Sequence, residues 1–219
     1  MNQLPAAVLW DMDGTLVDTE PYWIACEHQL VEEYDGTWTS ADAHSIVGFD
    51  LIDAAIALRD RGGVQLEPTQ IVEYLLDGVI ARVAIDLPWR PGSPELLAAC
   101  RAAGIPCALV TMSWRRLADA VIASAPPGSF AASITGDEVA HGKPDPEPYA
   151  AAAAALGVQP SRCVAIEDSP TGVASAIAAG CATLGVPHVV PLAPAAGLTI
   201  AASLADVALA DLTALLGRH

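Results

Sequence analysis

Lysine is almost absent from this sequence of 219 residues, in which Lys143 stands alone beside nine arginines. The 10 basic residues are outnumbered by 26 acidic ones, so the formal net charge is −16 at pH 7. Nucleic acids and anionic membranes are bound through clustered Lys and Arg side chains. The composition therefore argues against both partners, and a phosphorylated substrate would need a metal ion or one well-placed cation.

Long apolar runs and paired cysteines are also lacking. Hydrophobic residues make up 53% of the chain, yet no uninterrupted run approaches the ~20 residues that span a bilayer. No basic segment precedes the first apolar run, so we predict no signal peptide and a cytoplasmic protein. The 5 cysteines are scattered without Cys-x-x-Cys spacing, and we expect buried free thiols rather than disulfides or a zinc site.

The most informative stretch lies at residues 6–17. An apolar run of strand length ends there in Asp11, Met12, Asp13 and Gly14. Side chains two positions apart in a strand point the same way, so the two carboxylates are expected to converge, and a cation between them would relieve their repulsion. Mg²⁺ prefers such oxygen ligands. Taken alone, the pattern also fits an ordinary surface turn.

The remaining sequence divides into two regions. Residues 18–87 show helical spacing of apolar residues with no strand signal. From residue 88 strands alternate with helices, and we predict strands at 105–110, 131–135, 163–167 and 182–186, with a last strand and helix around 207–215 and a connection at 191–202. Apolar strands that alternate with helices predict a parallel sheet covered on both faces. We therefore expect an α/β core at 1–17 and 88–219, and a helical domain at 18–87.

Four polar clusters follow the predicted strands, either directly or in the next loop. They are Asp11 with Asp13, Thr111 with Met112 and Ser113, Lys143 alone, and Glu167 with Asp168. Ligands of parallel α/β sheets bind beyond the carboxyl ends of the strands. We therefore expect these clusters to meet at one edge of the sheet.

In their order and on these elements, the clusters resemble the four motifs of the haloacid dehalogenase (HAD) superfamily of phosphohydrolases. The helical region after the first motif resembles the helical cap of that superfamily, so the resemblance covers essentially the whole chain. It implies a Rossmann-like core with an inserted cap. It also implies hydrolysis of a small phosphorylated metabolite with Mg²⁺ as cofactor.

The resemblance implies a role for each motif. Asp11 would be the nucleophile that forms an aspartyl phosphate, and Asp13 the acid and base. Thr111, the Met112 backbone N–H and Ser113 would bind the phosphoryl group, while Lys143 would offset its charge and keep Asp11 ionised. The metal ligands would be Asp11, the backbone carbonyl of Asp13, Asp168 and, directly or through water, Glu167.

The resemblance leaves more than one reaction open. A β-phosphoglucomutase has a histidine where this chain has Trp23, and grips a second phosphate with a cap lysine that this chain lacks. Both departures favour a phosphatase of sugar or sugar-alcohol phosphates over a mutase. A non-catalytic protein that only accepts or binds a phosphoryl group is a third reading, which the complete set of motif residues disfavours. The substrate's identity and the oligomeric state stay open.

Overall fold

The computed structural model describes residues 4–47 and 49–217. The chain forms two compact units, Met1–Asp18 with Pro88–His219, and Thr19–Leu87. The backbone N–H of Asp18 donates to the Pro88 carbonyl (2.8 Å), and Val17 forms an isolated antiparallel bridge with Trp89. These contacts place Asp18 in the first unit, one residue beyond the boundary expected from the sequence.

The first unit is an α/β fold around a parallel sheet, as predicted. Within the described residues the sheet has 6 strands in the order β3-β2-β1-β4-β5-β6. They are β1 (Ala7–Trp10), β2 (Cys107–Val110), β3 (Ala132–Ile134), β4 (Cys163–Glu167), β5 (Ala182–Gly185) and β6 (Leu198–Ile200). β1 therefore lies inside the sheet, between β2 and β4, where the chain reverses its direction of travel across the strands.

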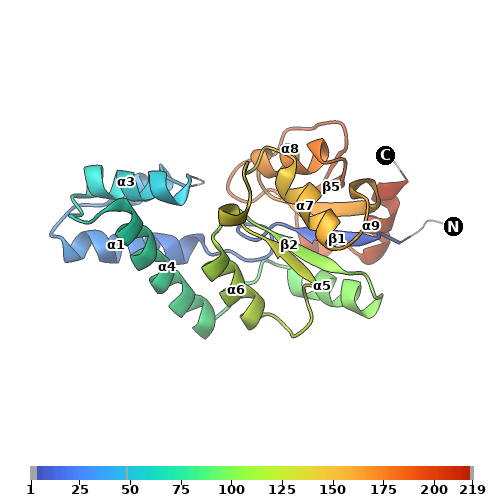
Figure 1. Ribbon diagram of the computed structural model, residues 1–219, viewed down its shortest axis with the longest axis horizontal. Helices are drawn as coiled ribbons and strands as arrows, with labels where there is room; N and C mark the ends of the chain where they lie inside the picture. The colour runs from blue at the N-terminus through green and yellow to red at the C-terminus, as the bar shows by residue number, and fades with distance from the viewer. Residues whose placement is uncertain (1–3, 48, 218–219) are drawn as a thin grey trace. The chain divides into compact units, whose positions relative to one another are not determined.

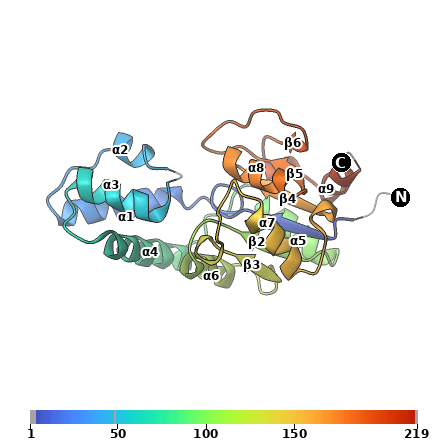
Figure 2. The same cartoon turned by 45° about the horizontal axis from the view of Figure 1, so that its top comes forward.

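Helices cover both faces of this sheet (Figures 1 and 2). They are α5 (Ser93–Ala102), α6 (Arg115–Ser124), α7 (Glu147–Ala155), α8 (Pro170–Ala178) and α9 (Leu209–Leu216), with short 3₁₀ turns η1 (Gly136–Glu138), η2 (Pro160–Arg162) and η3 (Leu204–Asp206). Every residue of β1, β2, β4 and β5 is buried. Burial on both faces explains why these strands read as continuous apolar runs.

Small side chains bring α7 close to the sheet. Ala7 and Leu9 of β1 belong to one buried cluster with Ala152 and Ala153 of α7. α7 packs against β1, β2 and β3. The alanine-rich sequence of this helix is thus a packing surface, and it leads directly out of the loop that carries Lys143.

The last strand lies elsewhere than predicted. β6 occupies Leu198–Ile200, inside the stretch expected to be a connection, whereas Val207 only follows the turn η3. β6 is a three-residue edge strand whose residues are half-buried or exposed. Such a strand has only one neighbour and carries a weak apolar signal, so the surrounding Ala and Pro residues obscured it.

The second unit is helical, with α1 (Glu20–Glu33), α2 (Ser40–His44), α3 (Leu51–Gly62) and α4 (Pro68–Ile85). α4 packs against both α1 and α3, and it buries Ile71, Leu75 and Val79 on one side. Thr19 occupies the N-cap position of α1, but its side chain makes no capping hydrogen bond. Whether this unit serves as a cap remains a prediction.

All five cysteines, Cys26, Cys100, Cys107, Cys163 and Cys181, are buried free thiols. In the part of the chain that the structure describes, no helix combines the length and the apolar character needed to cross a bilayer.

Candidate active site

The turn after β1 sets the position of Asp11. Its backbone N–H donates to the Ile166 carbonyl of β4 (3.0 Å). Asp11, the candidate nucleophile, therefore lies directly at the carboxyl end of β1. Gly14 then adopts a φ of +86°, and a Cβ there would lie 2.2 Å from Oδ2 of Asp168. Only glycine permits both this backbone conformation and this close approach. The turn therefore brings the first and last motifs together.

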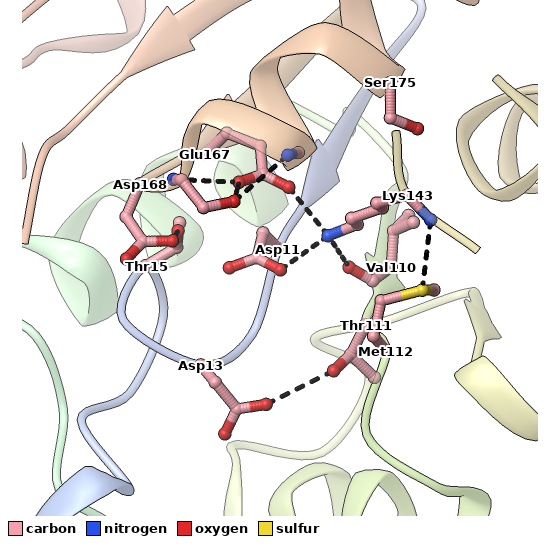
Figure 3. A network of polar contacts seen from close by, with 12 residues as sticks. Asp11, Asp13, Thr15, Val110, Thr111, Met112, Lys143, Glu167, Asp168 and Ser175 are labelled. Carbon is pink, nitrogen blue, oxygen red and sulfur yellow. Dashed lines mark hydrogen bonds and ion pairs between the residues drawn. The ribbon is translucent and has the colours of Figure 1, made fainter. Parts of the chain in front are cut away.

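Lys143 connects three strands of the sheet through its ammonium group (Figure 3). Its Nζ donates to Asp11 Oδ1 (2.6 Å), Glu167 Oε1 (2.7 Å) and the Val110 carbonyl (2.9 Å). These contacts use all three donors of an ammonium. Burial alone would lower the pKa of Lys143, but Asp11 and Glu167 raise it above its usual value. The lysine is therefore held in its charged form.

Glu167 is fully buried behind this lysine. Its Oε1 accepts from Lys143 and from the Tyr149 hydroxyl (2.7 Å), and its Oε2 accepts from the Oγ (3.0 Å) and N–H (3.3 Å) of Ser169. A Cβ on Gly172 would lie 1.8 Å from Oε1. With four donors and no room to move, Glu167 fixes the position of Lys143.

Tyr149 and the side-chain role of Ser169 escaped the sequence analysis. Tyr149 lies in a helix that is otherwise mostly alanine, and its ring also lies beside the Lys143 ammonium, 5.2 Å from Nζ to the centroid. The sequence did offer one signal for Tyr149, since it is a single polar aromatic residue in an alanine-rich helix that directly follows the loop of Lys143. The position of Ser169 before α8 indicates an N-cap, and its Oγ does accept from the Gly172 N–H. Its hydrogen bond to Glu167 is the role that the sequence did not indicate.

Three carboxylates crowd around one point beside Lys143. Burial and then Glu167 raise the pKa of Asp11 well above its usual value, against the opposite effect of Lys143. The same two causes raise the pKa of Asp168 to about 7. Oxygens of Asp11, Glu167 and Asp168 lie within 4.8 Å of one another. A cation at this point would favour the ionised forms of all three.

The donor set fits a hard divalent cation. Oδ2 of Asp11 is buried and has no hydrogen-bond partner among the described residues. Asp168 is held at the same point, since the Thr15 hydroxyl lies 3.4 Å from its Oδ1. Carboxylate oxygens in this arrangement are the ligands that Mg²⁺ prefers.

The Asp13 carboxylate points toward the second motif, so the structure does not show the convergence with Asp11 that strand alternation predicts, and a cation shared by the two carboxylates stays a prediction. Oδ2 of Asp13 accepts from Ser113 Oγ (2.7 Å) and lies 3.3 Å from Thr111 Oγ1. The backbone has already left the strand at Asp13, which forms an isolated bridge with Val17. The alternation of a strand no longer holds there. A metal contact through the backbone carbonyl of Asp13 stays a prediction as well.

The second motif forms a loop after β2. Thr111 accepts from the Ser113 N–H through its Oγ1 (3.0 Å), which gives the loop a tight turn. The Met112 sulfur lies 3.3 Å from the Lys143 N–H, and a Cβ on Gly136 would lie 2.2 Å from the Met112 carbonyl. Met112 thus packs between the lysine loop and η1. The structure brings the residues of all four motifs to one edge of the sheet (Figure 3).

Comparison with known proteins decides the family. The model of the haloacid dehalogenase-like hydrolases matches residues 5–180. The chain belongs to this family. Hexitol phosphatase A of Escherichia coli is 34% identical over 188 residues, which cover 81% of each chain. Protein CbbY of Rhodobacter capsulatus is 33% identical over 196 residues, covering 80% of this chain and 82% of CbbY.

A solved structure extends the likeness of this HAD hydrolase to the whole fold. CbbY from Rhodobacter sphaeroides, crystallised as an aspartate-to-asparagine mutant with xylulose-(1,5)bisphosphate, has a TM-score of 0.83 and 26% identity. The match covers 95% of this chain and 99% of that one. The chain is therefore a hydrolase of the HAD family, and its relatives include named phosphatases.

Proposed function

We propose that this HAD hydrolase is a Mg²⁺-dependent phosphatase that cleaves small phosphate monoesters, in particular sugar or sugar-alcohol phosphates, through an aspartyl phosphate on Asp11. The observation that carries the proposal is the asymmetry of the Asp11 carboxylate. Lys143 holds Oδ1, while the buried Oδ2 has no hydrogen-bond partner among the described residues. The relatives support the phosphatase, and the named hexitol phosphatase supports the substrate class.

The first chemical step belongs to Asp11 and Asp13. One oxygen of the Asp11 carboxylate attacks phosphorus, the bond between phosphorus and the ester oxygen breaks, and Asp13 donates a proton to the departing oxygen. Lys143 favours the ionised form of Asp11 against the effect of burial, and it offsets the charge of the phosphoryl oxygens. In the second step Asp13 takes a proton from water as the water attacks the phosphoryl group, which releases phosphate and restores Asp11.

The metal site would use Asp11, Asp168 and the backbone carbonyl of Asp13. Bound Mg²⁺ would neutralise charge on the phosphoryl group and draw it toward Asp11. Glu167 already accepts four hydrogen bonds. We therefore assign Glu167 to the support of Lys143, with a metal contact through water at most.

The charges of the helical unit favour hydrolysis over mutase activity. Residues 19–87 contain no lysine and three arginines, each with a partner inside the unit. Arg59 pairs with Asp60 (2.8 Å) and Arg61 with Asp42 (2.6 Å), while Arg82 lies 3.1 Å from Cys26 Sγ and 3.0 Å from the Gly78 carbonyl. A mutase must also grip a second phosphate, and the unit has no lysine for this task.

Phosphate release from a panel of monoesters tests the function. The panel holds hexose phosphates, hexitol phosphates and β-glucose 1-phosphate, each with Mg²⁺ or with EDTA. We expect release with Mg²⁺, strongest for one of the sugar or sugar-alcohol phosphates, and none with EDTA. Conversion of β-glucose 1-phosphate to the 6-phosphate in the presence of a bisphosphate primer, without net release, would instead establish the mutase.

Stabilisation by Mg²⁺ is expected to depend on pH. The pKa of Asp168 is raised to about 7 in the folded chain, so Asp168 binds its proton more tightly there than in the unfolded chain. The stability it contributes to the metal-free protein is therefore present below about pH 4 and is lost as the pH rises through about 7. Mg²⁺ competes with that proton. The Tm increase on adding Mg²⁺ should thus be several degrees larger at about pH 8 than at about pH 6.

Differential scanning fluorimetry at both pH values measures this increase. Asp168→Asn serves as the variant that lacks the titrating ligand, and it should lose most of the Mg²⁺ effect at both pH values. An equal Tm increase at the two pH values in the unmodified protein would contradict the assignment of Asp168 as a ligand.

A further inference from the structure

Arg115 is the first residue of α6 and directly follows the loop that carries Thr111 and Ser113. Its guanidinium points at β3 and η1. Nε lies 3.1 Å from Glu138 Oε1, and Nη2 donates to Glu138 Oε2 and to the Ser133 carbonyl (3.2 Å). Nη1 donates to Ser133 Oγ (2.7 Å) and lies 3.3 Å from Asp119 Oδ1. All five N–H donors of the guanidinium are therefore in use.

Backbone hydrogen bonds also connect α6, η1 and the loop of the second motif. The Arg115 N–H donates to Asp137 Oδ1 (3.0 Å), which also accepts from the Thr135 hydroxyl (2.7 Å). η1 in turn touches the motif loop, because the Gly136 N–H donates to the Ser113 carbonyl (3.1 Å). The Thr111 N–H donates to the Ile134 carbonyl (3.0 Å) at the other end of the loop. The loop is thus held between α6, β3 and η1.

We infer that Arg115 and Glu138 are positioning residues for the acid–base step. They join α6 to η1, this junction fixes the Ser113 backbone, and the Ser113 hydroxyl holds Asp13 Oδ2 at 2.7 Å. The inference rests on the proposed function, in which Asp13 protonates the leaving oxygen. A bidentate guanidinium pair suits this task, whereas a lysine would offer a single point contact.

The choice of substrate separates positioning from mere folding. An alkoxide leaving group, as in a hexitol phosphate, needs the proton from Asp13, whereas p-nitrophenolate is a weak base and leaves without one. A misplaced Asp13 should therefore slow the first substrate far more than the second. A variant that is partly unfolded would lose the same fraction of its activity toward both.

We expect Arg115→Gln to lower kcat for a hexitol phosphate about 10- to 100-fold with a small change in KM, and to lower kcat for p-nitrophenyl phosphate only a few-fold. Glu138→Gln should give the same pattern, and the double variant should be no worse than either single one, because both act through one contact. Arg115→Lys should recover part of the loss. Arg101→Gln, the same charge change on an exposed residue of α5, should leave both substrates unaffected.

Equal losses on the two substrates, or additive losses in the double variant, would overturn the inference while leaving the phosphatase intact. If the unmodified protein released phosphate from neither substrate, the proposed function would fail and this inference with it. Should Arg115→Gln fold poorly, the milder Glu138→Gln and Arg115→Lys carry the same comparison, with the Tm of each measured beside its kcat.

Discussion

Replacing Asp11 by Asn is expected to lower the turnover of phosphate monoesters at least about 10³-fold, because an amide cannot form the acyl phosphate. The substitution keeps the size of the side chain and leaves an oxygen for the Lys143 ammonium. Loss of the nucleophile is therefore the main change. Phosphate release under saturating Mg²⁺, measured on the best substrate of the panel, gives the ratio.

The stability of this variant should move in the opposite direction from its activity. Asp11 is buried beside Glu167 and Asp168, and burial and these charges raise its pKa. Removing its charge relieves that repulsion, so metal-free Asp11→Asn should unfold at the same Tm as the unmodified protein or at a higher one. Activity within about tenfold of the unmodified protein would exclude Asp11 as the nucleophile.

The fold was largely readable because its central strands are buried on both faces. Residues 6–10 and 163–167 read as strands, and the polar residues that follow them lie at the carboxyl edge as the parallel topology requires. β6 was missed because an edge strand of three half-exposed residues carries little apolar signal. The pattern of apolar residues in the sequence reflects burial, so fully buried strands can be predicted from it whereas a half-exposed edge strand cannot.

The positions of the site residues could be predicted from the sequence, but the directions of their side chains could not. Asp11, Thr111, Lys143 and Asp168 directly follow strands or their loops, so topology alone gathers them. The direction of each side chain depends on backbone turns. Asp13 lies in the turn after β1, where the alternation of a strand no longer applies, so its divergence from Asp11 was not predicted. Tyr149 approaches Glu167 from a helix packed on the sheet, a tertiary contact that no local spacing encodes.

Lys143 neutralises buried negative charge at the carboxyl edge of the sheet. It is the only lysine of the chain and the only cation that the structure places in contact with both Asp11 and Glu167 among the described residues. The acceptors of its three N–H groups belong to, or directly follow, β1, β2 and β4. A compact ammonium can donate in three directions at once, whereas the planar fork of an arginine cannot.

Lys143→Arg is accordingly expected to lower kcat/KM about 10²- to 10³-fold although the charge is kept. Lys143→Met should lower it at least as far, and it should also destabilise the protein by about 3–5 kcal/mol, because two buried carboxylates lose their cation. Without the lysine the pKa of Asp11 rises further, so the residual activity of Lys143→Met should move to higher pH. Steady-state kinetics across pH and denaturant unfolding measure the two effects.

A second substitution separates the catalytic from the structural effect of Lys143. Glu167→Gln in the Lys143→Met background removes one of the two unpaired carboxylates, so it should recover part of the lost stability. It should recover little activity, since the phosphoryl group and Asp11 still lack their cation. Recovery of both together would mean that Lys143 serves only the fold, and that the transfer step draws its positive charge from elsewhere.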